Sequence, residues 1–540
     1  MKDSTKQRVF WLVATAVIAA CVIGLDLISI MNEEIETIYN GGPGKLIQVF
    51  LLIALGVSLF YLFDKVKGQF IIALFVGILF CIFDLREAPK ASIIAGIAGT
   101  TVGILLAFAI KLVLWKYYRN NNCFGSKRVE AVLNALALFS VLQYCVYRFM
   151  QSTMFRIYYS DKYKVATLLL IIVLGGIRYV YLVLKNCWSC ENYKDVSYYI
   201  IKCILAWLLA APFFMVGIMH NYKALIYLPF CVMALYKMTP EFVLKWHTYV
   251  IGILFIATIM CSLAGTVQNI TYAGYGGVHC AYGIVQTTDC ASYVTFLLIG
   301  VWCGILSHKW VPCICFCVVT GILSYKFFVV TGSRTVLFSG ILLIVLVIWN
   351  CIDEKTDQNT AGFLRVLKKI VDTLSIIAFP AVAVFCIITA FLYAQKNPVA
   401  IEWNSYFSNR LLDTCELFQR FGVHLFGSDI EKLHGFGATL IHNSWSSGYT
   451  YLDEAYALLA IRYGVVITLI VAGLWMWMTV KALKGNRKRI ALAMGLIAIH
   501  GFFEARMIDV NYCIILIMPF CEFYKKRCLI GDKKLSVCNI

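Results

Sequence analysis

The stretch VPCICFCVVTGILSYKFFVVTGSRTVLFSGILLIVLVIWN, residues 311–350, decides what class of protein this is. It holds two apolar runs, near 312–330 and 336–349, joined by the short connection TGSRT at 331–335. A helix of about 20 apolar residues crosses a bilayer core. A cation near that core costs about 2.5 kcal/mol or more on insertion scales. Arg334, in the middle of the connection, therefore needs a place at the membrane edge or a partner.

The composition of the whole chain follows the same pattern. Hydrophobic residues make up 61% of the 540 residues and charged residues only 14%, whereas a soluble domain carries about 25% charged residues. The mean hydropathy is +0.80. These values predict an all-α, polytopic integral membrane protein with about 14 to 16 transmembrane helices.

The predicted spans are apolar runs whose ends are defined to within several residues. The first run has a basic flank and is too long for a signal-peptide core, so we expect it to be retained as a helix. The predicted spans lie near 9–30, 46–63, 69–84, 92–115, 129–150, 165–184, 198–219, 222–237, 248–265, 291–307, 311–330, 335–351, 373–394, 454–480, 490–504 and 510–524.

Loop charges predict how the chain is oriented. The net charge is +18, from 47 basic and 29 acidic residues, and the basic residues concentrate in alternate loops, as the positive-inside rule requires of cytoplasmic ones. Both termini are then cytoplasmic, and 265–290, TGSRT and 395–453 face outward. No basic face with interleaved aromatics is present, so we expect no nucleic-acid partner. The predicted cytoplasmic residues include Lys65, Lys67, Lys116, Arg119, Lys127, Arg128, His308, Lys309, Arg365, Lys368, Lys369, Lys481, Lys484, Arg487, Lys488, Arg489, Lys525, Lys526 and Arg527.

The predicted organisation has five parts. N-terminal transmembrane helices occupy 1–236, and central helices with the Ser-Arg connection occupy 237–394. A large extracytoplasmic loop spans 395–453, C-terminal helices span 454–524, and a cytoplasmic tail spans 525–540. Within the loop, NRLLDTCELFQRF at 409–421 has apolar positions at helical spacing and predicts a helix.

Arginines on the predicted outer side are the first candidate functional group. Arginine is permanently charged, and its planar fork of donors suits a phosphate or carboxylate. The alternative is that these side chains snorkel to lipid headgroups. Arg334 and Arg410 are the sharpest candidates, followed by Arg420, Arg462 and Arg506.

Acids and histidines on the same side form the second group. Asp453 is either a helix cap or a polar group that faces substrate. His500 and Glu504 stand four residues apart, which predicts neighbours on one helix face; they either pair with each other or act in function, as intramembrane ionisable residues often do. A loop histidine (His424, His434 or His442) is either an ordinary surface residue or a general base. The 22 cysteines lie mostly in apolar runs, where cysteine acts as a small hydrophobe, and no metal-site pattern or cofactor motif stands out.

Four stretches, in this order and on this predicted side, resemble the bacterial Wzy-type polysaccharide polymerases, relatives of the O-antigen ligases. The resemblance covers about Lys237 to Phe523. It departs at one point, since an arginine that often precedes the Gly-rich turn is missing and His279 is the residue that could replace it. The stretches are AYGIVQTTDCASYVTFLLIGVWC, VVTGSRTVLFSGILLIV, SNRLLDTCELFQRFGVHLFG with YLDEAYALLAIRYGVV, and IHGFFEARMIDVNY.

The resemblance implies a GT-C-like glycosyltransferase of the bacterial cytoplasmic membrane with an outward-facing active site. Its substrate would be undecaprenyl-diphosphate-linked oligosaccharide, polymerised into capsular or exopolysaccharide without metal or cofactor. Chain-length regulator and flippase proteins would be partners besides the lipid bilayer. Alternatives are a ligase that uses another acceptor and a transporter of lipid-linked oligosaccharide. The implied diphosphate contacts are Arg334, Arg410 and Arg462, and the implied acceptor-side residues are Asp453, His500 and Glu504.

Overall fold

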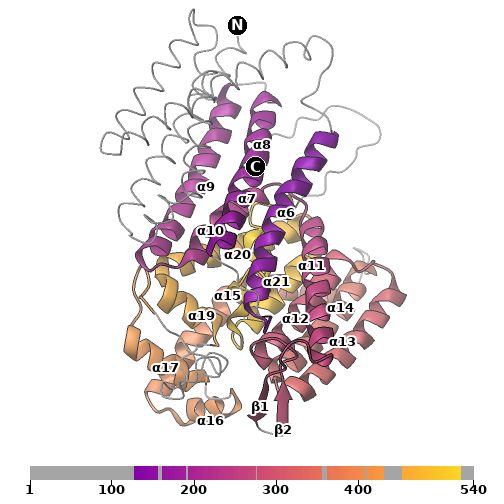
Figure 1. The fold of residues 1–540 in the computed structure, drawn as a ribbon, viewed down its shortest axis with the longest axis vertical. Helices are drawn as coiled ribbons and strands as arrows, with labels where there is room; N and C mark the ends of the chain where they lie inside the picture. The colour runs from indigo at the N-terminus through magenta and orange to yellow at the C-terminus, as the bar shows by residue number, and fades with distance from the viewer. Residues whose placement is uncertain are drawn as a thin grey trace, which may run out of the picture. The chain divides into compact units, whose positions relative to one another are not determined.

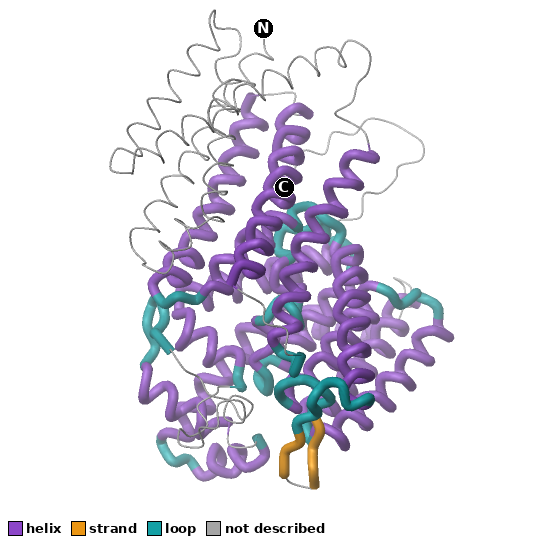
Figure 2. The backbone as a smooth tube through the Cα atoms, viewed as in Figure 1, coloured by secondary structure: helices purple, strands orange, loops and turns teal. Residues whose placement is uncertain are grey.

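The computed structural model describes residues 127–155, 161–189, 193–274, 277–355, 362–407, 410–430 and 453–523. Helices make up most of it, and two short strands form a β-hairpin (Figure 2). The predicted all-α class is therefore confirmed, apart from the hairpin. The four predicted spans before residue 127 lie outside the described residues, as do His434 and His442.

The chain divides into two compact units. The first holds described residues between 127 and 140 and between 161 and 211; the second holds 141–155 and everything described after 211. In the first unit, α6 (Lys127–Gln151) is tied to α8 (Gly176–Ser189), because Arg178 Nε donates to Asn134 Oδ1 at 2.6 Å. The helices between them are α7 (Asp161–Leu170) and the π-helix η2 (Ile171–Gly175), and α9 (Tyr193–Met219) follows α8.

The second unit is a bundle of antiparallel neighbours with a short hairpin (Figure 1). Strand β1 pairs antiparallel with β2, with Thr271 opposite Cys280. The elements of the second unit after residue 219, in chain order, are α10 (Lys223–Ala234), α11 (Pro240–Leu263), β1 (Thr271–Gly274), β2 (Gly277–Cys280), α12 (Thr287–Gly304), α13 (Trp310–Thr331), α14 (Arg334–Lys355), α15 (Gly362–Ala394), α16 (Pro398–Tyr406), α17 (Arg410–Phe421), α19 (Ala455–Leu458), the π-helix η3 (Leu459–Tyr463), α20 (Gly464–Lys484), α21 (Lys488–His500), and the 3-10 helices η4 (Ala505–Ile508) and η5 (Ile514–Ile517).

Seven helices within the described residues are long and apolar enough to cross a membrane. They are consistent with a polytopic membrane protein, while the total number of spans and the sidedness stay predictions. These helices cover Val129–Gln151, Tyr163–Val183, Pro240–Leu263, Trp310–Thr331, Arg334–Glu354, Gly362–Ala394 and Ala455–Lys484.

Helix α21 is the centre of the second unit. Residues 489–498 are all buried, and the helix contacts α12, α14, α15 and α20. A helix that is apolar all round belongs in the interior, which fits the sequence RIALAMGLIA at these positions. Its last residue, His500, is therefore buried among the surrounding helices, at one end of the bundle.

Basic residues gather at the other end of the bundle. Lys488 Nζ pairs with Asp353 Oδ2 at 2.5 Å, and Lys368 Nζ pairs with Asp353 Oδ1 at 3.0 Å. Arg489 Nη1 donates to the carbonyl of Leu306 at 2.6 Å, beyond the last turn of α12. These contacts join α12, α14, α15 and α21 at the end that the loop charges predict to be cytoplasmic.

The predicted helix over 510–524 is wrong. Helix α21 ends at His500, and the described chain after it is irregular, with two short 3-10 turns, η4 and η5. Its backbone finds partners elsewhere in the unit: Lys237 N donates to Phe520 O and Glu522 N donates to Met238 O. Irregular backbone is tolerated at membrane depth only where it is buried in protein, as it is here.

Candidate functional site

The TGSRT connection forms a tight corner between α13 and α14. Gly332 ends α13 with φ of +69°, a left-handed conformation that favours glycine. The ring of His279, on β2, packs against this glycine so closely that a Cβ there would lie 2.6 Å from it. Arg334 is the first residue of α14 and is exposed. The corner therefore places Arg334 at the end of a span, next to the hairpin that carries His279.

Arg410 and Asp453 meet in the part of the loop that is described. Arg410, the first residue of α17, approaches Asp453 with 3.6 Å between Nη2 and Oδ2, and both side chains are largely buried. The predicted helix at 409–421 is thus confirmed as α17. Asp453 is not the cap of the next helix, since that position is Glu454, whose side chain makes no capping hydrogen bond. Asp453 is instead the partner of an arginine that comes from 43 residues earlier in the chain, which no local pattern predicts.

His500 and Glu504 lie in the same region but are not on one helix face, because α21 stops at His500 and Glu504 has extended backbone angles. His500 Nδ1 lies 2.8 Å from the hydroxyl of Ser339, on α14. Glu504 is 1% exposed, and its Oε2 has no hydrogen-bond partner among the described residues. Asp453, Arg506 and Arg410 all act on it electrostatically. Glu504 is thus a buried carboxyl left open beside the Arg410–Asp453 pair.

Aromatic rings connect the start of α14 with the start of α17. The rings of Phe338 and Phe503 are 5.6 Å apart, and those of Phe503 and Phe407 are 5.8 Å apart. Arg334 is one helical turn before Phe338, and Arg410 is three residues after Phe407. Each arginine thus stands within four residues, along the chain, of a ring at one end of this line.

A buried ion-pair ladder borders this region. Arg506 Nε donates to Asp289 Oδ1 at 2.5 Å, and its Nη1 lies 3.2 Å from Asp509 Oδ2. Asp509 Oδ1 is in turn 3.0 Å from Arg148 Nη2, on α6. Burial raises the pKa of Asp509, but Arg148 and Arg506 lower it more, and the result is below the usual carboxyl range. The ladder fastens α6 and the start of α12 to the irregular segment that carries Glu504.

The ladder predicts a loss of stability when one rung is removed. Replacing Asp289 with Asn should lower the free energy of unfolding by about 2 kcal/mol, because the buried hydrogen bond from Arg506 keeps an acceptor but loses the negative charge that strengthens it. Thermal unfolding of the purified protein in detergent measures this. Asp413→Asn is the matched control. Burial, Asp453 and Glu416 raise the pKa of Asp413 to about 6, so its ionised form is less favourable in the folded protein than in water, and the neutral amide should leave stability unchanged or higher. Equal destabilisation by both would contradict the ladder's role.

Arg462, the third predicted diphosphate contact, packs against an aromatic ring. It belongs to the π-helix η3, and its guanidinium stacks on the ring of Tyr222 at 4.4 Å. The hydroxyl of Tyr222 bonds the backbone of Ser428 and Ile430, so this residue holds the segment 422–430 against the bundle. Gly464, with φ of +88°, allows the same segment to approach the backbone closely. Arg462 therefore helps to dock the loop.

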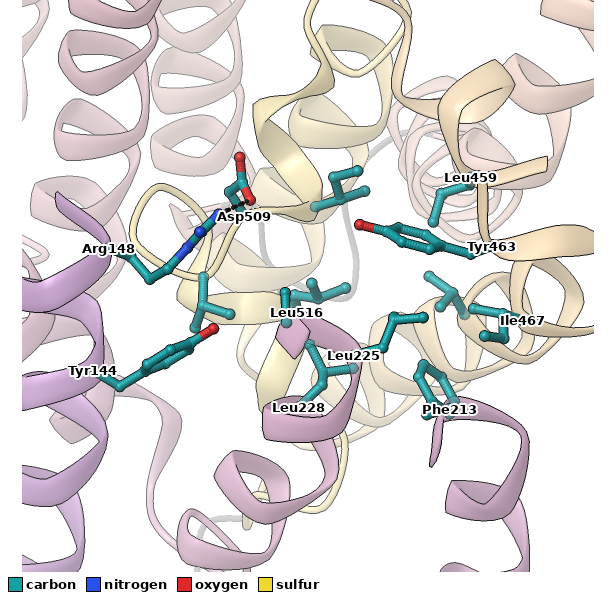
Figure 3. Close-up of a pocket in the computed structure, with 14 residues that line it drawn as sticks. Tyr144, Arg148, Phe213, Leu225, Leu228, Leu459, Tyr463, Ile467, Asp509 and Leu516 are labelled. Atoms are coloured by element: carbon teal, nitrogen blue, oxygen red, sulfur yellow. Dashed lines mark hydrogen bonds and ion pairs between the residues drawn. The ribbon is translucent and has the colours of Figure 1, made fainter. Parts of the chain in front are cut away.

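A mainly apolar pocket lies next to η3 (Figure 3). Leu225, Leu228 and Ile467 line it, and the Arg148–Asp509 pair closes one end. The hydroxyls of Tyr144 and Tyr463 point into the same space (Figure 3). The pocket is thus polar at the ladder and apolar elsewhere.

The ladder residues Arg148, Asp289 and Asp509 were missed in the sequence. Arg148 falls inside the predicted span 129–150 and Asp289 just before 291–307, and ionisable residues at such positions are functional candidates by default. That signal alone finds them, but it does not pair them. Among the described residues, no group of three or more His, Cys, Asp or Glu side chains is arranged to hold a metal ion.

No protein-family model matches this chain, and no curated protein or solved structure is significantly similar to it. The site must therefore be interpreted from its own residues.

Proposed function

We propose that this chain is a GT-C-like membrane glycosyltransferase that polymerises undecaprenyl-diphosphate-linked oligosaccharide repeats at the outer face of the bacterial cytoplasmic membrane. The observation that carries the proposal is that Arg410 lies against Asp453 and beside the buried Glu504, at the bundle end where α14 starts with the exposed Arg334. This arrangement offers cations and carboxyls together at the edge of the apolar spans.

The chemistry of the proposed transfer needs both kinds of group. The bond that breaks joins a sugar to a lipid diphosphate, so negative charge develops on the leaving phosphate, and fixed guanidinium groups stabilise it. The bond that forms joins that sugar to an acceptor hydroxyl, which must lose a proton to a base. We assign the first role to Arg334 and Arg410 and the second to a carboxyl beside Arg410. The diphosphate bond supplies the energy, so neither ATP nor a nucleotide sugar is required.

The lipid-linked species that accumulate when the gene is deleted test this proposal. We expect single repeats, still on undecaprenyl diphosphate, to accumulate at the outer face of the membrane, with no long polymer. Mass spectrometry of extracted lipids identifies the species, and an impermeant oxidant of sugars shows which face carries them. Single repeats on the inner face would support the transporter alternative instead. Long polymer that stays on the lipid would support a ligase. Either result overturns the polymerase.

A further inference from the structure

Glu454 makes buried hydrogen bonds that have no role in the proposed transfer and that the sequence motifs do not predict. Its side chain is fully buried. Its Oε2 accepts a hydrogen bond from Thr414 Oγ1 at 3.0 Å and another from Cys386 Sγ at 2.7 Å. Thr414 belongs to α17 and Cys386 to α15. One carboxyl oxygen thus joins a loop helix and a membrane span to the start of α19.

This contact runs beside the Arg410–Asp453 pair. Arg410 and Thr414 stand four residues apart on α17 and so lie on one face of it, while their partners Asp453 and Glu454 are consecutive. The two contacts therefore form adjacent rungs between α17 and the chain that enters the bundle. The next residue, Ala455, donates its N–H to Gly501 O at 2.9 Å, which fixes this entry point against the end of α21.

We propose that Glu454 is a positioning residue that holds Asp453 against Arg410 by locking α17 to α15. We call the contacts of Glu454 with Thr414 and Cys386 the lock. The effect of the lock on transfer rests on the proposed function, but the lock itself does not. A carboxyl buried without a full set of partners is costly, and the Oε1 of Glu454 has no hydrogen-bond partner in the described part of the chain. A position that only needed packing would be filled by an apolar side chain. A carboxyl at position 454 is explained if it serves to hold its two hydrogen-bond donors, Thr414 on α17 and Cys386 on α15, in place.

Opening of the lock can be measured without any transfer assay. In native membranes, Thr414→Val removes the hydroxyl donor and keeps the side-chain shape. It should raise the rate at which N-ethylmaleimide modifies Cys386 by about fivefold, the effect expected from losing one buried hydrogen bond. Mass spectrometry of the Cys386 peptide gives the rate. The matched control is Thr389→Val, because Thr389 lies one turn along α15 and its hydroxyl donates to backbone carbonyls of its own helix. An equal rate in both variants overturns the lock.

The pH dependence of the same reaction gives a second test. Burial raises the pKa of Glu454 to about 7, although Cys386, Thr414 and Arg410 lower it and Asp453 raises it further. The closed state therefore favours the protonated carboxyl, whereas a carboxyl released to water ionises in its ordinary range. The closed state is most stable below that ordinary range and loses stability as the pH rises through about 7. Glu454→Gln keeps an acceptor for both donors but cannot ionise.

We expect the ratio of Cys386 modification in the unaltered protein to that in Glu454→Gln to rise between pH 6 and 8. The intrinsic reactivity of the thiol cancels in this ratio. A flat ratio overturns the assignment. For transfer, Glu454→Gln should keep most of the activity at neutral pH and Thr414→Val should lower kcat more than it changes KM. If the unaltered protein transfers nothing while Cys386 responds as expected, the proposed function fails and the lock stands.

Discussion

Replacing Arg410 with alanine is expected to lower polymer formation by about 100- to 1,000-fold, the usual effect of removing one donor that stabilises developing charge. The protein should still reach the membrane, because Arg410 is at the first position of α17 and the helix keeps its apolar contacts through Leu411 and Leu417. Asp453 would then lose its ion pair with Arg410, and Glu504 would lose one of the two cations that act on it. Loss of Arg410 also removes a charge that lowers the pKa of Glu504, so this carboxyl becomes harder to ionise and a poorer base, which acts in the same direction.

Arg420→Ala is the matched control for Arg410→Ala. Arg420 is on the same helix but is exposed, and its guanidinium lies over the ring of Phe421 at 5.2 Å. It should polymerise normally. Arg410→Lys should recover only part of the activity, since an ammonium keeps the charge but not the fork of donors. The measurement is polymer length and yield in a deletion strain that carries each variant. The amount of each variant in the membrane is measured in the same strains. Normal long polymer from Arg410→Ala would remove Arg410 from the site.

The sequence predicts helices well where apolar residues recur at helical spacing or form one long apolar run. The helix that starts at Arg410 follows from its apolar spacing, and the one that starts at Arg334 follows from the glycine before it and the apolar run after it. The same signal fails after His500. The segment 510–523 is as apolar as a span, yet it folds as turns, because neighbouring elements supply partners for its backbone. Hydropathy registers burial and does not distinguish burial in protein from burial in lipid.

The pairing of charges was the part of the site that the sequence could not give. Asp453 was a candidate as a cap, and only the fold brings Arg410 to it. The sequence allows Arg506 to snorkel to lipid headgroups, but the fold holds it between Asp289 and Asp509. These partners are separated by three to 217 residues along the chain, and a charge in an apolar environment needs a partner from whichever element is near. A single sequence shows that such a partner is needed without showing which residue it is.

Replacing Glu504 with glutamine is expected to lower transfer by about 100-fold or more, the range for loss of a positioned proton acceptor. The geometry favours Glu504 as the base over the two other predicted residues. Asp453 is engaged by Arg410, and His500 Nδ1 is engaged by Ser339, whereas Glu504 Oε2 is unpartnered within the described residues. Glutamine has nearly the same shape and is neutral, so a buried site tolerates it and the protein level should not fall.

A kinetic measurement separates a base from a merely structural carboxyl. With purified protein and a lipid-linked repeat, Glu504→Gln should lower kcat and leave KM within about twofold, because an interaction made only in the transition state is lost. Burial and Asp453 raise the pKa of Glu504, so in the unaltered protein kcat should fall as the pH drops below this raised pKa, and in Glu504→Gln that fall should disappear. Glu416→Gln, an exposed carboxyl on α17, should change neither. If Glu504→Gln keeps this pH dependence and most of kcat, the proton must go to another acceptor. His500, whose Nε2 has no hydrogen-bond partner among the described residues, is then the residue to replace.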